Sequence, residues 1–198
     1  MTIRKVFSVG LVIIFLALPS AVSGEGFGFK PGLEPDGFRG IKWGTDISIL
    51  RGMELVEDDG LDKFYKNKED NMMIGAAQLS EIIYVFWDGK FASILIQTNG
   101  QKNYGHLKDA CFEKFGKGMR TDADQRSDIE YYIWEGAMTG IDLKYEKVKD
   151  VGSLYIFSLD VKRKQATWGK QKLEKGQEQE RDQLERPAYV RDRTFTVT

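Results

Sequence analysis

Cysteine and histidine are almost absent from this chain, since its 198 residues contain one of each, Cys111 and His106. A single cysteine cannot form a disulfide within its own chain, so the fold must be stable without one. The two residues lie five positions apart in a helical pattern, which turns them about 140° from each other. We therefore expect His106 on the helix surface, Cys111 among buried apolar side chains, and no nucleophile and base pair between them.

The short motifs that usually accompany catalysis or nucleotide binding are also missing. The sequence contains no GxxxxGK[ST] loop, no GxGxxG between a strand and a helix, and no GxSxG nucleophile turn. Two acidic segments, 57–62 and 122–128, lack the ligand spacing of a calcium loop, and we interpret both as polar turns. The sequence thus predicts a protein that is not an enzyme, with no metal and no cofactor.

The first 23 residues have the composition of a secretory signal peptide. Arg4 and Lys5 precede an apolar run over 6–18, and small residues follow Pro19. This order predicts export and cleavage near Ser23 and Gly24, with an uncleaved membrane anchor as the alternative. No cysteine lies near the signal, which excludes a lipid anchor there.

Charge is distributed unevenly over the remaining chain of about 175 residues, a length typical of one domain. Residues 24–161 hold 17 Lys and Arg against 24 Asp and Glu, a net of −7, whereas residues 162–198 hold 10 against 6, a net of +4. An acidic body argues against a nucleic-acid partner. Membrane contact is expected only through an uncleaved signal or the basic tail.

Gly and Pro dominate 24–37, which predicts a linker or extended arm. The domain itself is expected over 38–161. A short strand over 38–44 should lead into a helix capped by Thr45 or Asp46, with Ile47, Leu50 and Met53 on its apolar face. The segment 61–66 reads as a strand, and 67–80 as irregular with a turn of helix near Met72.

Two hairpins and one helix give the clearest patterns. Ile82–Trp87 and Phe91–Thr98 flank the turn pair Asp88-Gly89. A helix capped by Asn103 follows, with an apolar stripe of Tyr104, Leu107, Cys111 and Phe115, and Gly116 ends it. Three more strands are expected over 129–134, 141–145 and 154–161.

The overall prediction is a two-layer α+β fold with a mainly antiparallel sheet of about six strands and two helices on one face. Trp87-Asp88-Gly89 and Trp134-Glu135-Gly136 occupy similar places in the two hairpins, which suggests a weak α-β-β-β duplication. The tail over 162–198 is highly charged and should be a solvated helix or disordered.

Aromatic residues alternate along the strands so that both sheet faces are apolar. Two helices on one face leave the other open, and we expect Tyr84, Phe86, Tyr132 and Trp134 to form a ligand or partner surface there. Burial under the linker or in a dimer is the alternative.

The segment 38–45, Phe-Arg-Gly-Ile-Lys-Trp-Gly-Thr, resembles the opening of small exported bacterial proteins, often of unknown function, with a Phe-x-Gly-Ile-x-Trp-Gly pattern. The likeness covers about residues 38–161. It implies a periplasmic α+β module and brings no catalytic residues.

Three functions follow as hypotheses. The first is an exported, non-enzymatic periplasmic binding or envelope-associated protein that recognises a protein or small-molecule partner. The second is a structural or assembly protein whose basic C-terminal tail contacts an acidic partner or an anionic membrane surface. The third is a hydrolase using Asp128 and Glu130, which alternate onto one strand face.

Overall fold

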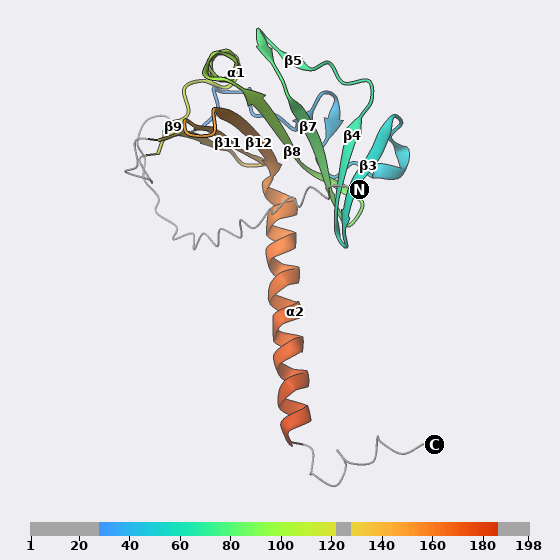
Figure 1. Ribbon diagram of the computed structural model, residues 1–198. Coiled ribbons are helices and arrows are strands. Elements are labelled where there is room, and N and C mark those ends of the chain that lie inside the picture. Colours follow the sequence, from blue (N-terminus) through green and yellow to red (C-terminus); the bar gives the residue numbers. More distant parts are fainter. Residues whose placement is uncertain (1–27, 122–127, 186–198) are drawn as a thin grey trace, which may run out of the picture.

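The computed structural model describes residues 28–121 and 128–185. Its centre is an antiparallel sheet with the strand order β3-β4-β7-β8-β12-β11-β10-β9 (Figure 1). The strands are β3 (Met53–Asp59), β4 (Asp62–Asn67), β7 (Glu81–Trp87), β8 (Lys90–Asn99), β9 (Met119–Arg120), β10 (Ile129–Glu135), β11 (Thr139–Glu146) and β12 (Val151–Ser158).

Smaller elements surround this sheet. Two short hairpins and one turn of 3₁₀ helix are β1 (Gly37–Phe38) with β2 (Ile41–Lys42), β5 (Met73–Ile74) with β6 (Ala77–Gln78), and η1 (Ile47–Ile49). The two α-helices are α1 (Gln101–Phe115) and α2 (Leu159–Glu185).

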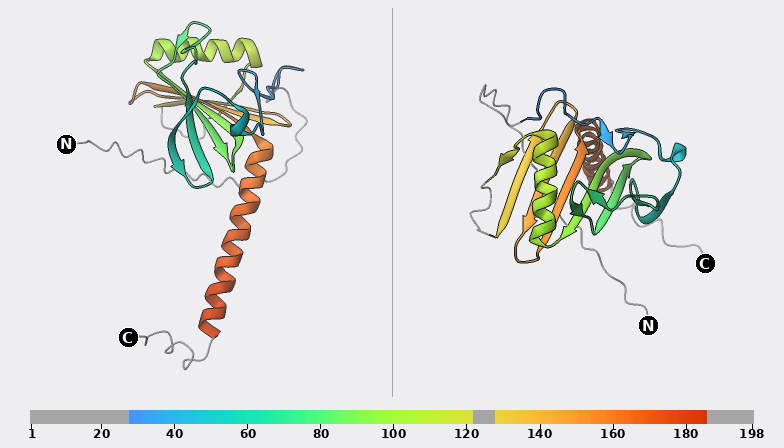
Figure 2. Two further views of the ribbon diagram at one scale, coloured as in Figure 1. Left: turned by 90° about the vertical axis from the view of Figure 1, so that its right-hand side faces the viewer. Right: turned by 90° about the horizontal axis from the view of Figure 1, so that it is seen from above.

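The α+β class and the large antiparallel sheet are confirmed, but two details of the prediction are wrong. The sheet has eight strands among the described residues instead of about six. Only α1 packs across a sheet face, whereas α2 leaves the body on the opposite side and projects away from it (Figure 2). The sheet therefore has one covered face and one open face.

The largest local error concerns the segment after Gly44. Asp46 does cap a helix, since its Oδ1 accepts a hydrogen bond from the Ser48 N–H at 2.9 Å, but that helix is a single 3₁₀ turn. Met53 begins strand β3 instead of ending a helix. β3 is an edge strand with a bulge between Leu55 and Glu57 and mostly exposed side chains, so it lacks the apolar alternation that marks inner strands.

Two other segments form hairpins where the sequence suggested something simpler. The expected strand over 38–44 is the hairpin β1–β2, because Arg39 and Gly40 both adopt positive φ, 49° and 82°, and turn the chain. The segment 67–80, expected to be irregular with a helical turn, contains the hairpin β5–β6.

The β7–β8 hairpin and helix α1 are confirmed. Asp88 and Gly89 have φ values of 49° and 73°, as a two-residue turn between twisted strands requires. The helix begins at Gln101 with Gly100 as its N-cap, so the prediction that Asn103 caps it is wrong; the Asn103 amide donates to the Asn99 carbonyl from inside the first turn.

The core lies between α1 and the sheet. Alternate residues of the inner strands point toward α1. The helix packs its predicted apolar stripe against them, and all four residues of that stripe are buried: Tyr104, Leu107, Cys111 and Phe115. Burial raises the pKa of the Cys111 thiol to about 12, so it stays protonated and acts as an apolar side chain.

The N-terminal arm packs against this body from residue 28 onward. Phe29 meets Phe115 edge to face at 5.7 Å, and the Glu34 carboxylate accepts the backbone N–H groups of Met138 and Thr139. Trp43 donates its indole N–H to Thr139 Oγ1 at 2.7 Å. The arm thus joins the β11 end of the sheet to the β1–β2 hairpin.

The two tryptophan hairpins of the suggested duplication differ in their environment. Trp134 is buried beneath α1, whereas Trp87 is partly exposed on the opposite side, at a recess beside Trp43. The strand order does place two four-stranded meanders side by side, joined by β8 and β12. Duplication stays a prediction.

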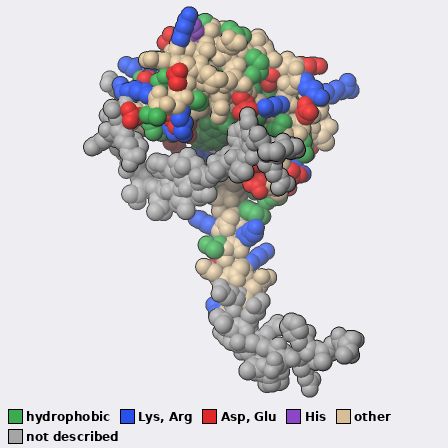
Figure 3. All heavy atoms as spheres, in the orientation of Figure 1, with side chains coloured by type: hydrophobic (Ala, Val, Ile, Leu, Met, Phe, Trp, Pro, Cys, Tyr) green, Lys and Arg blue, Asp and Glu red, His purple; other side chains and the backbone are tan. Residues whose placement is uncertain are grey.

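Helix α2 begins three residues before the predicted tail. Its residue Val161 is buried, but from Lys162 to Gln179 nearly every side chain is exposed, and Lys and Arg project on both sides of the helix (Figure 3). Leu173 is 64% exposed and Trp168 is 42% exposed. The described part of the predicted tail is thus a largely exposed helix, and residues 186–198 lie outside the described residues.

We expect Leu107→Ala to lower the free energy of unfolding by about 2–5 kcal/mol, because Leu107 is fully buried beneath α1 and its loss leaves a cavity. Leu173→Ala on the projecting helix is the matched control and should change it by about 0.5 kcal/mol or less. Denaturant unfolding of both variants measures the difference, and equal losses would contradict this assignment of core and surface.

Candidate functional site

The four aromatic residues predicted to form a ligand surface lie in the core instead. Tyr84, Phe86 and Trp134 are at most 1% exposed and Tyr132 is 7% exposed. The alternation along each strand grouped them correctly on one face, but that face is the one that α1 covers. The alternation of apolar residues along a strand shows which residues share a face of the sheet. It does not show which of the two faces α1 packs against.

Each polar group on these aromatic residues is used within the protein. The Tyr84 hydroxyl donates to Asp70 at 2.9 Å, and the same carboxylate binds Arg39 at 2.7 Å. Trp134 donates its indole N–H to the Gly116 carbonyl at 2.9 Å. These contacts hold Tyr84 and Trp134 in the core beneath α1.

The other residues considered from the sequence are likewise engaged. His106 lies on α1 with its Nδ1 3.0 Å from the Ala76 carbonyl, so it tethers the β5–β6 hairpin. Asp58, in the first acidic segment, binds Lys63 and accepts the Gly60 N–H in a polar turn. Glu130 pairs with Lys108 at 2.8 Å, while Asp128 is exposed. Residues 122–127 of the second acidic segment lie outside the described residues.

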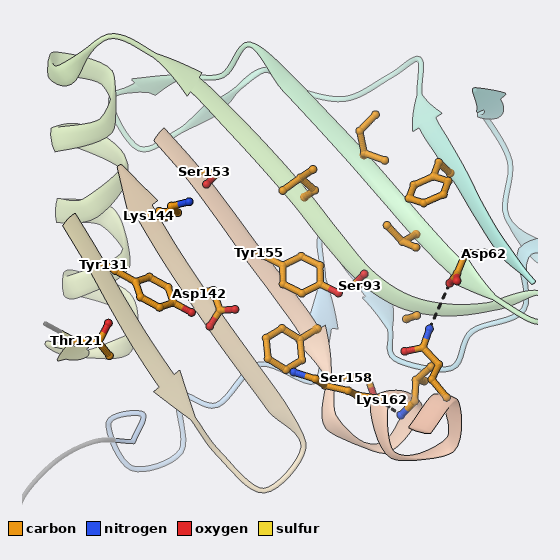
Figure 4. A pocket seen from close by; sticks show the side chains of 18 of the residues that line it. Asp62, Ser93, Thr121, Tyr131, Asp142, Lys144, Ser153, Tyr155, Ser158 and Lys162 are labelled. Carbon is orange, nitrogen blue, oxygen red and sulfur yellow. Dashed lines mark hydrogen bonds between the residues drawn. The ribbon is translucent and has the colours of Figure 1, made fainter. Parts of the chain in front are cut away.

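The open face of the sheet holds a cavity of about 770 Å³ (Figure 4). Strands β4, β7, β8, β10, β11 and β12 form its floor, and the first turns of α2 form one wall. Its apolar lining comes from Phe64, Ile83, Val85, Ala92, Leu95, Ile129, Tyr155, Phe157 and Val161, and its polar lining includes Asp62, Ser93, Tyr131, Asp142, Lys144, Lys162 and Gln165.

Strand register places four of these side chains in one row across the sheet. Asp142 on β11 is the direct partner of Tyr155 on β12, and Tyr155 is the partner of Leu95 on β8. Leu95 in turn pairs with Ile83 on β7. The row therefore runs from a carboxylate through an aromatic ring to two aliphatic side chains.

Tyr155 and Phe157 form an aromatic pair next to this row. Their rings stack at 5.0 Å with an angle of 26°, and Tyr155 keeps 37% of its surface exposed in the middle of the sheet. Phe157 lies over Gly140, where an added Cβ would come within 2.3 Å of the ring. The Lys162 ammonium sits 4.3 Å from the Phe157 ring centre.

The apolar surroundings also affect the ionisation of Asp142 on β11. Burial raises the pKa of its carboxyl, and nearby Glu135 on β10 raises it further. A hydrogen bond from Tyr131 and the charge of Lys162 on α2 act in the opposite direction without cancelling the effect of burial. Figure 4 shows the Tyr131 hydroxyl pointing toward this carboxylate.

Asp62 lies on the other side of the cavity. Burial also raises the pKa of its carboxyl, with the charge of Asp59 as a second cause. Its Oδ1 accepts a hydrogen bond from the Gln165 amide at 3.3 Å, which ties α2 to strand β4. The first turns of α2 thus approach both acidic residues of the cavity, Asp142 through Lys162 and Asp62 through Gln165.

A second recess of about 570 Å³ lies between the arm and the start of α2, lined by Trp43 and Trp87 among others. Its lysines are already paired, Lys42 with Asp36 and Lys90 with Asp46 at 2.9 Å each. The open-face cavity is the better candidate, since it is the larger of the two and its lining is mostly apolar with a few polar groups.

Within residues 28–121 and 128–185, no group of His, Cys, Asp and Glu is arranged to hold a metal ion. In the same part of the chain, no helix is long and apolar enough to cross a membrane. Comparison of the chain with family models, with curated proteins and with solved structures gives no match.

Sequence reasoning missed Tyr155, Phe157 and Asp142 as site residues. The alternation along β12 already separated Tyr155 and Phe157 from Leu154 and Ile156, so these two aromatic residues could have been assigned to the second face. Strand β11 alternates apolar with polar residues, and Asp142 is one of its polar positions together with Lys144 and Glu146, so the sequence carries no signal that separates it from a solvated strand face.

We expect Asp142→Asn to be more stable than the original protein at pH 7, because the folded state holds this carboxyl at a raised pKa and its ionisation opposes folding. The advantage should shrink as the pH falls through the folded-state pKa and vanish below the ordinary Asp value of about 3.9. Thermal unfolding from pH 3 to pH 8 measures this.

The exposed Asp109 on α1 provides the control, since Asp109→Asn should show no comparable pH-dependent gain. An Asp142→Asn variant that is less stable at pH 7 than at pH 4, relative to the original protein, would contradict a desolvated carboxylate.

Proposed function

We propose that this chain is an exported, non-enzymatic binding protein whose site is the cavity on the open face of its sheet. The observation that carries the proposal is the lining of that cavity. A volume of about 770 Å³ falls within the usual range for small-molecule sites, and a mostly apolar wall with a few placed polar groups is the usual composition.

The arrangement of layers supports this site. Helix α1 and the arm build the main core on one face of the sheet. Apolar side chains such as Ile83, Val85 and Leu95 nonetheless line that second face. An uncovered apolar sheet face usually marks a binding surface.

The non-enzymatic part of the proposal rests on how the reactive groups are used. Cys111 is a buried thiol with a raised pKa, and His106 is bound to a backbone carbonyl. The export part rests on the pattern of residues 1–23, which lie outside the described residues.

Helix α2 favours a second function, that of an assembly protein. It is a helix of 27 residues in which nearly every side chain from Lys162 to Gln179 is exposed. Its charges are segregated: residues 159–173 contain five Lys and Arg against one Asp, and residues 174–185 contain two against five Asp and Glu. The basic half lies next to the body, where it would meet an acidic partner or an anionic surface.

We expect the exported product to bind the neutral fluorescent probe N-phenyl-1-naphthylamine, with an increase in its emission as it enters the apolar cavity. Leu95→Glu should weaken binding at least tenfold, because it places a charge on the cavity floor. Ile49→Glu, at a residue 71% exposed elsewhere, should leave binding unchanged. Unfolding midpoints of both variants establish that they are folded, and equal binding by all three proteins would exclude the cavity as the site.

We also expect the native product to begin near Gly24 and to fractionate with the periplasm or the medium, because the leader has the order of a cleavable signal. Intact mass measured on each cell fraction tests this. An intact Met1 end in the cytosol would overturn export, and the same end in the membrane fraction would indicate an uncleaved anchor.

A further inference from the structure

We propose that the ligand of the open-face cavity is an amphiphile with a cationic head, bound with its ammonium group beside Asp142 and its apolar body across Tyr155, Leu95 and Ile83. This inference rests on the binding function proposed above and narrows the class of ligand. It is carried by the order of side chains along one row of the sheet.

The head position is defined by Asp142. Its carboxylate lies in the cavity between β10 and β12, and the Tyr131 hydroxyl donates one hydrogen bond to it. A carboxylate offers about four acceptor positions, so a further charged donor can be accommodated. The hydrogen bond from Tyr131 and the nearby charge of Lys162 do not offset the burial of this half-buried carboxylate, and a ligand ammonium group would supply a direct ion pair.

The aromatic pair next to Asp142 also favours a cation. The structure already places one ammonium group on it, since Lys162 Nζ lies 4.3 Å from the centre of the Phe157 ring. Tyr155, which stacks on Phe157 and faces Asp142 across the strand pair, presents the neighbouring ring. Ring faces attract cations and repel carboxylates. The Asp142 carboxylate and the Tyr155 ring therefore both favour a positively charged head group.

The remainder of the row fits an apolar tail. Asp142, Tyr155, Leu95 and Ile83 stand on four adjacent strands, which span roughly 14 Å at about 4.8 Å per strand. Val85 and Phe64 widen the aliphatic end. An alkyl chain lying across the strands would therefore contact side chains along its whole length.

An anionic amphiphile fits less well. Lys144 is bound to Glu146 at 2.8 Å, and Lys162 already lies on the Phe157 ring and faces Asp142. A carboxylate head would have to enter near Asp142 or Asp62, the two acidic residues of the lining. Repulsion from either one weakens such a complex.

The test is displacement of N-phenyl-1-naphthylamine from the full exported protein by decylamine, decanol and decanoate at pH 7, each below its micelle concentration. We expect decylamine to displace the probe at a concentration at least tenfold lower than decanoate, with decanol between them. In Asp142→Asn, the displacing concentrations of decanoate and decylamine should differ by less than threefold. Asp62→Asn is the matched control, and this variant should keep most of the preference for decylamine over decanoate.

The outcomes separate this inference from the function it rests on. Equal displacement by all three compounds, or an amine preference that survives Asp142→Asn, overturns the cationic head and leaves the cavity as an apolar site. Tighter binding of decanoate that Lys162→Gln abolishes would assign an anionic ligand instead. Failure of the probe itself to bind would remove the proposed function first.

Discussion

In the described part of the chain, one helix, α1, covers one face of an eight-stranded sheet, and the other face stays open. Because successive residues of a strand point to opposite faces, every inner strand contributes side chains both to the core under α1 and to the open side. On β12, Leu154 and Ile156 pack beneath the helix, while Tyr155 and Phe157 face the cavity. Stability and binding are thereby assigned to alternate residues of the same strands.

Helix α2 contacts the body mainly at the wall of the open-face cavity and not at the core beneath α1. Only its first turns contact the sheet, through Val161, Lys162 and Gln165. Beyond them, as far as Gln179, nearly every side chain is exposed and most are polar, and Gly169 and Gly176 in the helix interior each weaken it by about 1 kcal/mol relative to Ala. A helix without a packed apolar face is marginal in water, because most helical stability in proteins comes from tertiary packing.

The elements that the sequence predicted best are those fixed by local chemistry. Asp88-Gly89 requires a tight turn, and the stripe on α1 requires a buried helix face, so both were found without knowledge of the fold. β3 and the β1–β2 hairpin were missed because edge strands and two-residue strands need little apolar patterning. The choice of face for α1 is a tertiary property, which is why Tyr84 and Trp134 were assigned to the wrong side.

The same tertiary choice explains why Asp142 is informative only in the structure. In the sequence Asp142 is one acidic residue among many, and an acidic residue on a solvated strand face is common. Once α1 covers the opposite face, Asp142 stands among Tyr155, Ile129 and Phe157 with the base of α2 beside it. Burial in that setting opposes ionisation, and the hydrogen bond from Tyr131 and the charge of Lys162 do not cancel this effect, while the side chain faces the open cavity. A fold selected for stability alone gains nothing from such a carboxylate, whereas a binding site gains a point of charge recognition.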